Sequence, residues 1–239
     1  MSPSGAGYRA GHGAGTAFLL STRAALPGHA LRGSLEHRGD DIVTIPTLLV
    51  TASPHREEAL GNRLARKIAA RKGGDLLVRD LAAEPLAPLT VDYARALTLR
   101  DPLPRSSATL ELSERLIQEL ESTDRLIVAT PMHNFGMPAA LKLWVDYVLR
   151  IHRTFAPIPQ GKVGLLADRP TLVIVSSGGF HRAGESKQPN FLTPHLEAVL
   201  STLGIRAPEF VYLEGLVGRR ATPEAMIAEA VAALGDAWY

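Results

Sequence analysis

Residues 130–150, TPMHNFGMPAALKLWVDYVLR, join the end of an apolar segment to a helix that has one apolar face. The segment before them, residues 125–130, is mostly apolar and predicts a buried β-strand that stops at Pro131. After a polar turn at 133–136, apolar side chains recur at the three- and four-residue spacing of a helix face. They are Leu141, Trp144, Val145, Val148 and Leu149. The stretch therefore predicts a strand, a shaped loop and an amphipathic helix.

The same alternation of short apolar runs and helical patterns continues along the chain from about residue 42. Strands are expected at 45–51, 76–78, 125–130, 171–175 and 210–213, and helices at 60–72, 107–122, 138–149, 193–203 and 222–235. Thr193 is expected to cap its helix, with Pro194 in the first turn. Residues 82–106 and 152–169 are expected to be irregular. Five strands separated by helices predict an α/β fold with a doubly wound parallel sheet, in the flavodoxin-like strand order 2-1-3-4-5.

The composition sets limits on the class of protein. The chain has 239 residues, 46% of them hydrophobic, which is enough for one sizeable core. Its 26 basic and 24 acidic residues nearly balance, and no basic stripe with interleaved aromatic residues predicts a nucleic-acid partner. No segment reaches the roughly 18 apolar residues of a transmembrane helix. Cysteine is absent, which excludes disulfides and thiolate catalysis. A cytoplasmic protein is the expectation.

The N-terminal residues differ in composition from the rest of the chain. Residues 1–41 contain 8 of the 21 glycines, and their one apolar cluster, at 17–20, is shorter than the apolar region of a signal peptide. We expect a disordered extension over 1–41, or a start codon that the cell does not use, followed by one domain over 42–239. A targeting peptide is the alternative. The spaced glycines at 11–15 follow no strand, so they do not meet the context of a dinucleotide-binding loop.

Three loops follow the first, third and fourth predicted strands, which would be neighbours in the sheet. Ser53 precedes a helix start, and helix N-termini bind anions. The loop at 131–136 offers an imidazole, an amide and an aromatic ring, which suit a flat heterocycle with polar edges. The loop at 176–181 has paired glycines, which allow a ligand close to the backbone. Each loop alone is equally consistent with an ordinary turn, and their convergence favours a nucleotide site.

At these residues the chain resembles the FMN-dependent NADH azoreductases and quinone reductases. The strongest match is Pro131–Met132–His133–Asn134–Phe135–Gly136, followed by Pro138 and Leu141–Lys142. Further matches in order and spacing are Val78–Arg79–Asp80–Leu81, Thr154–Phe155, Ser176–Ser177–Gly178–Gly179, Thr193–Pro194 and Glu214–Gly215. The resemblance extends from about residue 47 to residue 220, and together these motifs are specific.

The resemblance implies a flavodoxin-like FMN-binding domain with NADH as electron donor. It implies that Ser53 holds the FMN phosphate together with the run Ala59, Leu60 and Gly61. It implies that Met132, His133, Asn134 and Phe135 lie along the isoalloxazine ring, with Ser176, Ser177, Gly178 and Gly179 at the other side. The chain departs from the family pattern at four positions. Ala59 and Gly61 replace typical serines, Ser177 replaces a common arginine, and His133 replaces a common tyrosine.

The activity that the resemblance implies is two-electron, ping-pong NADH:quinone oxidoreduction with azoreductase activity. The flavin would carry the chemistry, so no protein nucleophile is expected, and His133 or His181 would assist by hydrogen bonding to the acceptor or the flavin. The family is homodimeric with its sites at the subunit interface. We expect Trp144 in the core or at a subunit contact, and an exposed Trp144 or Phe191 would serve that interface. The alternatives are a reductase that uses FAD or NADPH, an FMN electron carrier or redox sensor without its own NADH turnover, and a flavin-free binding module.

Overall fold

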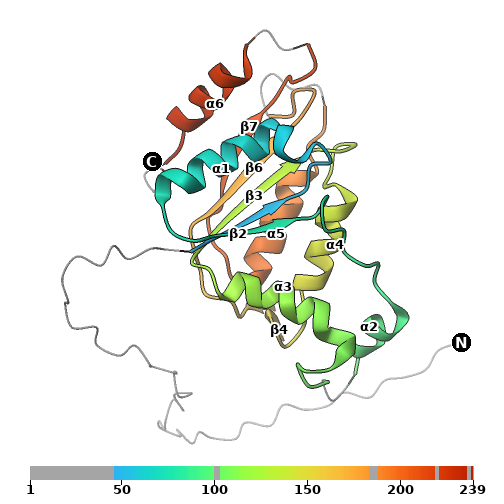
Figure 1. Ribbon diagram of the computed structural model, residues 1–239. Coiled ribbons are helices and arrows are strands. Elements are labelled where there is room, and N and C mark those ends of the chain that lie inside the picture. The colour runs from blue at the N-terminus through green and yellow to red at the C-terminus, as the bar shows by residue number, and fades with distance from the viewer. Residues whose placement is uncertain (1–45, 100–102, 183–187, 219–220, 236–237, 239) are drawn as a thin grey trace, which may run out of the picture. The chain divides into compact units, whose positions relative to one another are not determined.

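Five parallel strands form the central sheet of the protein, in the order β2-β1-β3-β6-β7 (Figure 1). The computed structural model describes residues 46–99, 103–182, 188–218, 221–235 and 238. The strands are β1 (Thr47–Thr51), β2 (Leu76–Asp80), β3 (Arg125–Pro131), β6 (Thr171–Ser176) and β7 (Glu209–Leu213). The predicted order 2-1-3-4-5 is confirmed, because β6 and β7 are the fourth and fifth strands of this sheet. The extension over 1–41 and the boundary at residue 42 lie outside the described residues.

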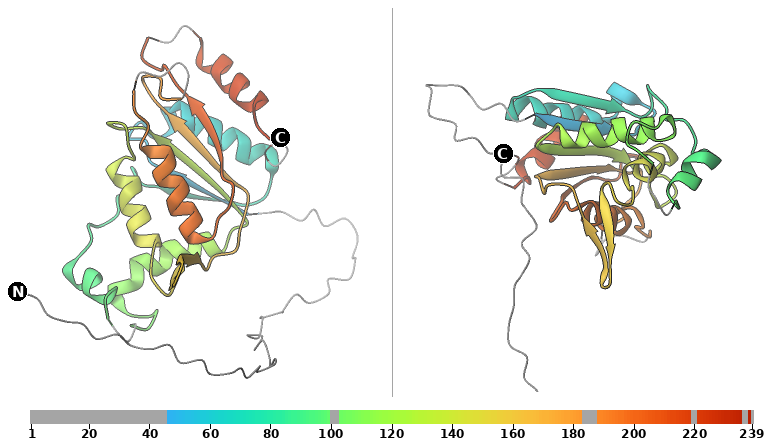
Figure 2. Two further views of the ribbon diagram at one scale, coloured as in Figure 1. Left: turned by 180° about the vertical axis from the view of Figure 1, so that it is seen from behind. Right: turned by 90° about the horizontal axis from the view of Figure 1, so that it is seen from below.

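Helices cover both faces of the sheet (Figures 1 and 2). They are α1 (Leu60–Lys72), α2 (Val91–Ala96), α3 (Glu111–Glu121), α4 (Ala139–Val148), α5 (Leu192–Leu203) and α6 (Pro223–Ala232). Side chains alternate between the faces of a strand, so Leu48 and Val50 pack with α3, α4 and α5 while Leu49 packs with α1 and α6. Because both faces are covered, the central strands are continuous apolar runs. No helix in the described segments combines the length and hydropathy of a membrane-spanning segment.

Trp144 lies in the core, so the expectation that it contributes an exposed surface to a subunit interface is wrong. Its side chain has no exposed surface, and it packs on the same helix face as Leu141 and Val145. The helical spacing that places these residues on one face also turns that face toward the sheet. Phe191, the other residue expected at an interface, is 64% exposed.

Two further predictions are corrected by the structure. Residues 152–169, expected to be irregular, contain an antiparallel hairpin of β4 (Phe155–Ile158) and β5 (Gly161–Gly164). Proline is tolerated in such a two-stranded ribbon because each strand has an unpaired edge. Thr193 does not cap α5, because the helix already begins at Leu192 and the Thr193 N–H donates to Asn190 Oδ1 at 3.0 Å. Asn190 therefore supplies the capping oxygen.

A buried cluster of charges fastens α3 to the segment between α4 and the hairpin. Glu114 accepts hydrogen bonds from Arg150 and Arg153, and Arg153 also binds Glu121 at 2.6 Å. Both arginines are buried, at 4% and 7% exposed. Burial by itself would raise the pKa of Glu114, but the hydrogen bonds from Arg153 and Arg150 outweigh burial and hold this pKa below its ordinary value.

We predict that Glu114→Gln lowers the free energy of unfolding by about 3 kcal/mol at pH 7, because it leaves two buried guanidinium groups without their shared carboxylate. The folded-state pKa of Glu114 lies below its ordinary value of 4.5. The carboxylate therefore stabilises the fold fully above that value, and its contribution is lost as the pH falls through the folded-state pKa. Urea denaturation should show that the difference in the free energy of unfolding between wild type and variant becomes smaller at acidic pH than at neutral pH.

The control for this prediction is Glu111→Gln, since Glu111 lies on the same helix and is exposed. It should change stability by less than about 0.5 kcal/mol. A gap between wild type and Glu114→Gln that is equally large at neutral and acidic pH would contradict the assigned role of the carboxylate.

Candidate functional site

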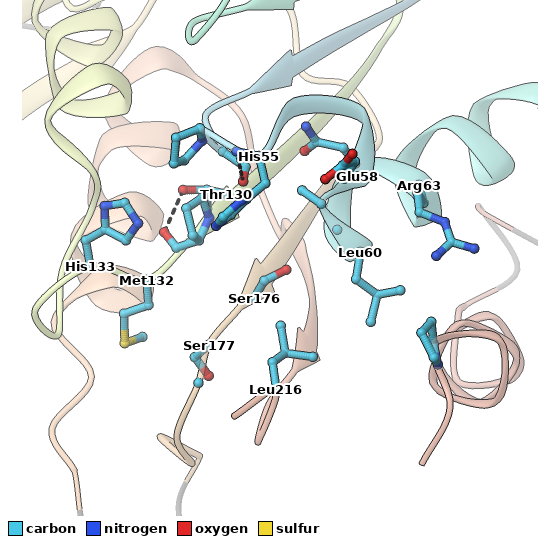
Figure 3. A pocket seen from close by; sticks show the side chains of 18 residues that line it. His55, Glu58, Leu60, Arg63, Thr130, Met132, His133, Ser176, Ser177 and Leu216 are labelled. Carbon is cyan, nitrogen blue, oxygen red and sulfur yellow. Dashed lines mark hydrogen bonds between the residues drawn. The ribbon is translucent and has the colours of Figure 1, made fainter. Parts of the chain in front are cut away.

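A cavity of about 580 Å³ opens at the carboxyl ends of β1, β3 and β6 (Figure 3). Crevices at this edge of an open parallel sheet, where the strand order reverses, are the usual ligand sites of such folds. The predicted site residues that line the cavity are Ser53, Ala59, Leu60, Gly61, Met132, His133, Ser176, Ser177 and Gly178. Figure 3 shows Met132 and His133 on one side of the cavity and Leu60 and Arg63 on the other. The fold thus brings together three loops that are distant in sequence.

One end of the cavity is the start of α1. The N-cap residue Ala59 makes no side-chain capping bond, so within the described part of the chain the N–H groups of Leu60, Gly61 and Asn62 in the first turn are left to face the cavity. All three residues are buried and line the cavity. Asn62 uses its side-chain amide to donate to the Arg56 carbonyl at 2.7 Å, which closes the loop ahead of the helix. Free N–H groups and the positive end of the helix dipole make this end suitable for an anion.

Gly61 allows α1 to approach the end of β6 closely. A Cβ atom at this position would lie 2.7 Å from the Ser176 Oγ. A larger residue here would require the Ser176 hydroxyl to rotate away. This end of the cavity therefore presents backbone donors together with the buried Ser53. The Ser53 Oγ accepts from the His55 N–H at 3.3 Å.

The loop after β3 forms a tight turn. The backbone groups of His133 and Gly136 bond each other in both directions at 3.0 Å. Asn134 and Phe135 have φ values of 48° and 71°, in the left-handed region that is uncommon for a bulky residue such as phenylalanine. Such conformations concentrate at functional sites. His133 lines the cavity, whereas Asn134 and Phe135 lie at the exposed tip of the turn, outside the lining.

The loop after β6 extends the pairing of β6 with β7, because its backbone bonds the end of β7 and the residues that follow. Its Ser177 N–H donates to the Leu213 carbonyl at 2.9 Å, and the Leu216 N–H donates back to the Ser177 carbonyl at 3.1 Å. The Ser177 hydroxyl donates to the Gly179 carbonyl at 2.8 Å, so this side chain stabilises the turn. Gly179 and His181 lie beyond the cavity lining.

Several residues that line the cavity were not among the predicted site residues. They are Pro54, His55, Glu58, Asn62, Arg63, Thr130, Pro131, Leu216 and Pro223. Asn62 and Arg63 directly follow the predicted phosphate run, so the helix start could have indicated them. Leu216 and Pro223 come from the loop that joins β7 to α6 and carry no local signal. Arg63 Nη2 and Glu224 Oε1 are 3.0 Å apart and join α1 to the start of α6 at the margin of the cavity.

Comparison with known proteins agrees with the fold. The family model for the flavodoxin-like fold matches residues 46–237. An FMN-dependent NADH:quinone oxidoreductase of Pseudomonas fluorescens is 53% identical over 192 residues, which cover 78% of this chain and 92% of the relative. One from Burkholderia lata is 50% identical over 174 residues, covering 71% and 84%.

Among solved structures, an azoreductase from Bacillus anthracis matches with a TM-score of 0.66 at 21% identity, covering 78% of this chain and 95% of that one. At this identity the match concerns the fold alone. The fold and its cavity thus define a flavodoxin-like protein. From the sequence relatives, the chain belongs to the family of FMN-dependent NADH:quinone oxidoreductases.

Proposed function

We propose that this protein is an FMN-dependent NADH:quinone oxidoreductase that also reduces azo compounds. The observation that carries the proposal is the cavity at the edge of the sheet where the strand order reverses. There the start of α1, whose N-cap residue makes no side-chain bond, faces the loops after β3 and β6. Its relatives of about 50% identity bear the name of this activity. As part of the same proposal we place the enzyme in the cytoplasm, where NADH is available as donor.

The residues of the cavity fit FMN. The N–H groups of Leu60, Gly61 and Asn62 provide donors for the phosphate, and the Ser53 hydroxyl adds a further polar contact. The loops after β3 and β6 provide the two sides for the ring system, with Met132 and His133 on one side and Ser176 to Gly178 on the other. A cavity of about 580 Å³ lies within the usual range for small-ligand sites, roughly 300–1,000 Å³.

The protein's part in the reaction is to bind, orient and shield the reactants. FMN, when bound, supplies the two-electron chemistry between NADH and the acceptor. The exposed imidazole of His133 stands at the cavity and can donate a hydrogen bond to an acceptor oxygen. His181 holds a proton on Nδ1, because this atom lies 2.9 Å from the Pro189 carbonyl, which can only accept. Overall, NADH, a proton and a quinone give NAD⁺ and a hydroquinone.

The function is tested by the visible spectrum of the purified protein and its response to NADH. We expect a yellow protein, or a colourless one that FMN reconstitutes, whose flavin absorbance is bleached by NADH without air and restored by a benzoquinone. A protein that does not bind FMN would contradict the proposal. Flavin that NADH and NADPH leave oxidised would instead indicate an electron carrier or redox sensor without NADH turnover.

His133 is the residue we expect to influence the choice of acceptor. His133→Tyr exchanges the imidazole for the phenol that is common in the family, and the turn backbone that holds this position is unchanged. We expect relative kcat/KM values among quinones and azo dyes to shift by about tenfold, the effect of about 1.4 kcal/mol in the transition state. His195→Tyr, on an exposed part of α5, is the control. If both variants keep the wild-type ranking of acceptors, His133 does not select among them.

We also propose that the protein is a homodimer with the cavity near the subunit interface. Phe135 and Phe191 are 42% and 64% exposed, and the Phe191 N–H donates to the Phe135 carbonyl at 2.9 Å. Exposed apolar groups that lie together mark interaction sites. Light scattering should give twice the 25.6 kDa chain mass for the wild type and a lower value for Phe191→Asp. The control is Val91→Asp on α2, where the side chain is 66% exposed. A monomeric wild type would refute the proposal.

A further inference from the structure

Glu214, directly after β7, has a buried carboxylate that binds a neighbouring loop. Its side chain is 5% exposed. Oε1 accepts from the main-chain N–H groups of His181 at 2.6 Å and Arg182 at 3.1 Å. Oε2 accepts from the Arg182 Nε at 2.9 Å. Hydrogen bonds to a charged group are stronger than those between neutral groups. Both carboxylate oxygens of Glu214 are therefore engaged by the segment that follows the cavity loop after β6.

These bonds complete a series of contacts between the loops after β6 and β7. The backbone N–H groups of Gly215, Leu216 and Val217 donate to the carbonyls of residues 177–179 at 3.1–3.3 Å. After Gly179, the Glu214 carboxylate accepts hydrogen bonds from the N–H groups of His181 and Arg182. One carboxylate thus extends the attachment of the loop from residue 179 to residue 182.

His181 connects this attachment to the loop after β3. Its ring bonds the Pro189 carbonyl through Nδ1 at 2.9 Å. The same ring lies edge-on to Phe135, with ring centroids 6.3 Å apart and planes at 60°. Phe135 is also bound through its carbonyl by the Phe191 N–H. The backbone of His181, which Glu214 holds, therefore positions a ring that contacts both Pro189 and Phe135, and Phe135 follows the cavity-lining His133 by two residues.

Arg182 fixes Glu214 from the solvent side. Its side chain is 64% exposed, and its guanidinium lies 5.6 Å from the centre of the Tyr212 ring, within cation–π distance. The Tyr212 hydroxyl lies 2.9 Å from the Thr193 Oγ1 at the start of α5. The Arg182 guanidinium that pairs with Glu214 is thus held in turn by the Tyr212 ring.

We propose that Glu214 is a positioning residue for the acceptor. It sets the course of residues 177–182 and, through the ring contact of His181 with Phe135, the place of the turn that carries the cavity-lining His133. Glu214 does not line the cavity of about 580 Å³ but a separate groove beside β7 and α6, so it acts through these loops. The role in acceptor binding rests on the proposed oxidoreductase function, whereas the attachment of the loop does not.

The first experiment measures the hydrogen-exchange rates of the loop amides in the flavin-free protein. In the wild type, the His181 and Arg182 amides should exchange at least tenfold more slowly than in an unstructured peptide. Glu214→Ala should remove most of this protection, and Glu214→Gln should stay within about threefold of wild type, because its amide oxygen still accepts. The matched control is Glu229→Ala, an exposed carboxylate that lines the same groove. Amides of His181 and Arg182 that are unprotected in the wild type would overturn the proposal, whether or not the variants fold. Amides that keep their protection in a folded Glu214→Ala variant would overturn it as well.

The second experiment follows the steady-state constants of the FMN-loaded enzyme. We expect Glu214→Ala to raise the KM for a benzoquinone about tenfold, with kcat changed less than threefold, and Glu214→Gln to restore the KM. Glu229→Ala should leave both constants unchanged. If the amides lose protection while the KM stays at the wild-type value, Glu214 holds the loop without positioning the acceptor, and the proposal is wrong. Absence of NADH turnover in the wild type would refute the oxidoreductase function and leave the exchange result standing.

Discussion

The parallel pairing of the strands is the constraint on which the rest of the structure depends. In the register of the sheet, Thr51 pairs with Ala129, Pro131 with Ser176, and Ser176 with Leu213. The strands therefore end at nearly the same level, and the loops that follow them begin side by side. A slip of one residue would exchange the two faces of a strand, and it would also separate these loops. The same register thus fixes both the packing of the core and the shape of the cavity.

The layout of the fold could be predicted because its strands are apolar runs that helices cover on both faces. The spacing of Leu141, Trp144 and Val145 predicted α4, and the apolar residues of β3 and β6 predicted central strands. The hairpin of β4 and β5 was missed because its prolines and glycines are typical of loops, and only its place in the tertiary structure gives it strand pairing. The cap of α5 was misplaced because Thr193 followed by Pro194 also fits the start of a helix, and the sequence alone does not show that Asn190 accepts from the Thr193 N–H.

The site was predictable where it follows strands and less so where it depends on tertiary contacts. Ser53, His133 and Ser176 lie at or directly beyond strand ends, and the topology brings them to one cavity. By contrast, the position of Leu216 depends on how the chain returns after β7, which no local pattern describes. The contact of Gly61 with Ser176 joins residues that are far apart in sequence. The close approach of these two residues is therefore visible in the packed structure and not in the sequence.

Buried backbone N–H groups need partners, and the edge of the sheet meets this need in two different ways. Near the loop after β7, strand pairing ends and the Glu214 carboxylate takes the N–H groups of His181 and Arg182. At the start of α1, the N-cap residue Ala59 offers no side-chain acceptor to the N–H groups of the first turn. A carboxylate at the α1 start would satisfy these groups and also repel an anionic ligand. The Glu214 carboxylate therefore lies where the loop needs to be held, whereas the first turn of α1 keeps its backbone donors at the cavity, as the proposed phosphate site requires.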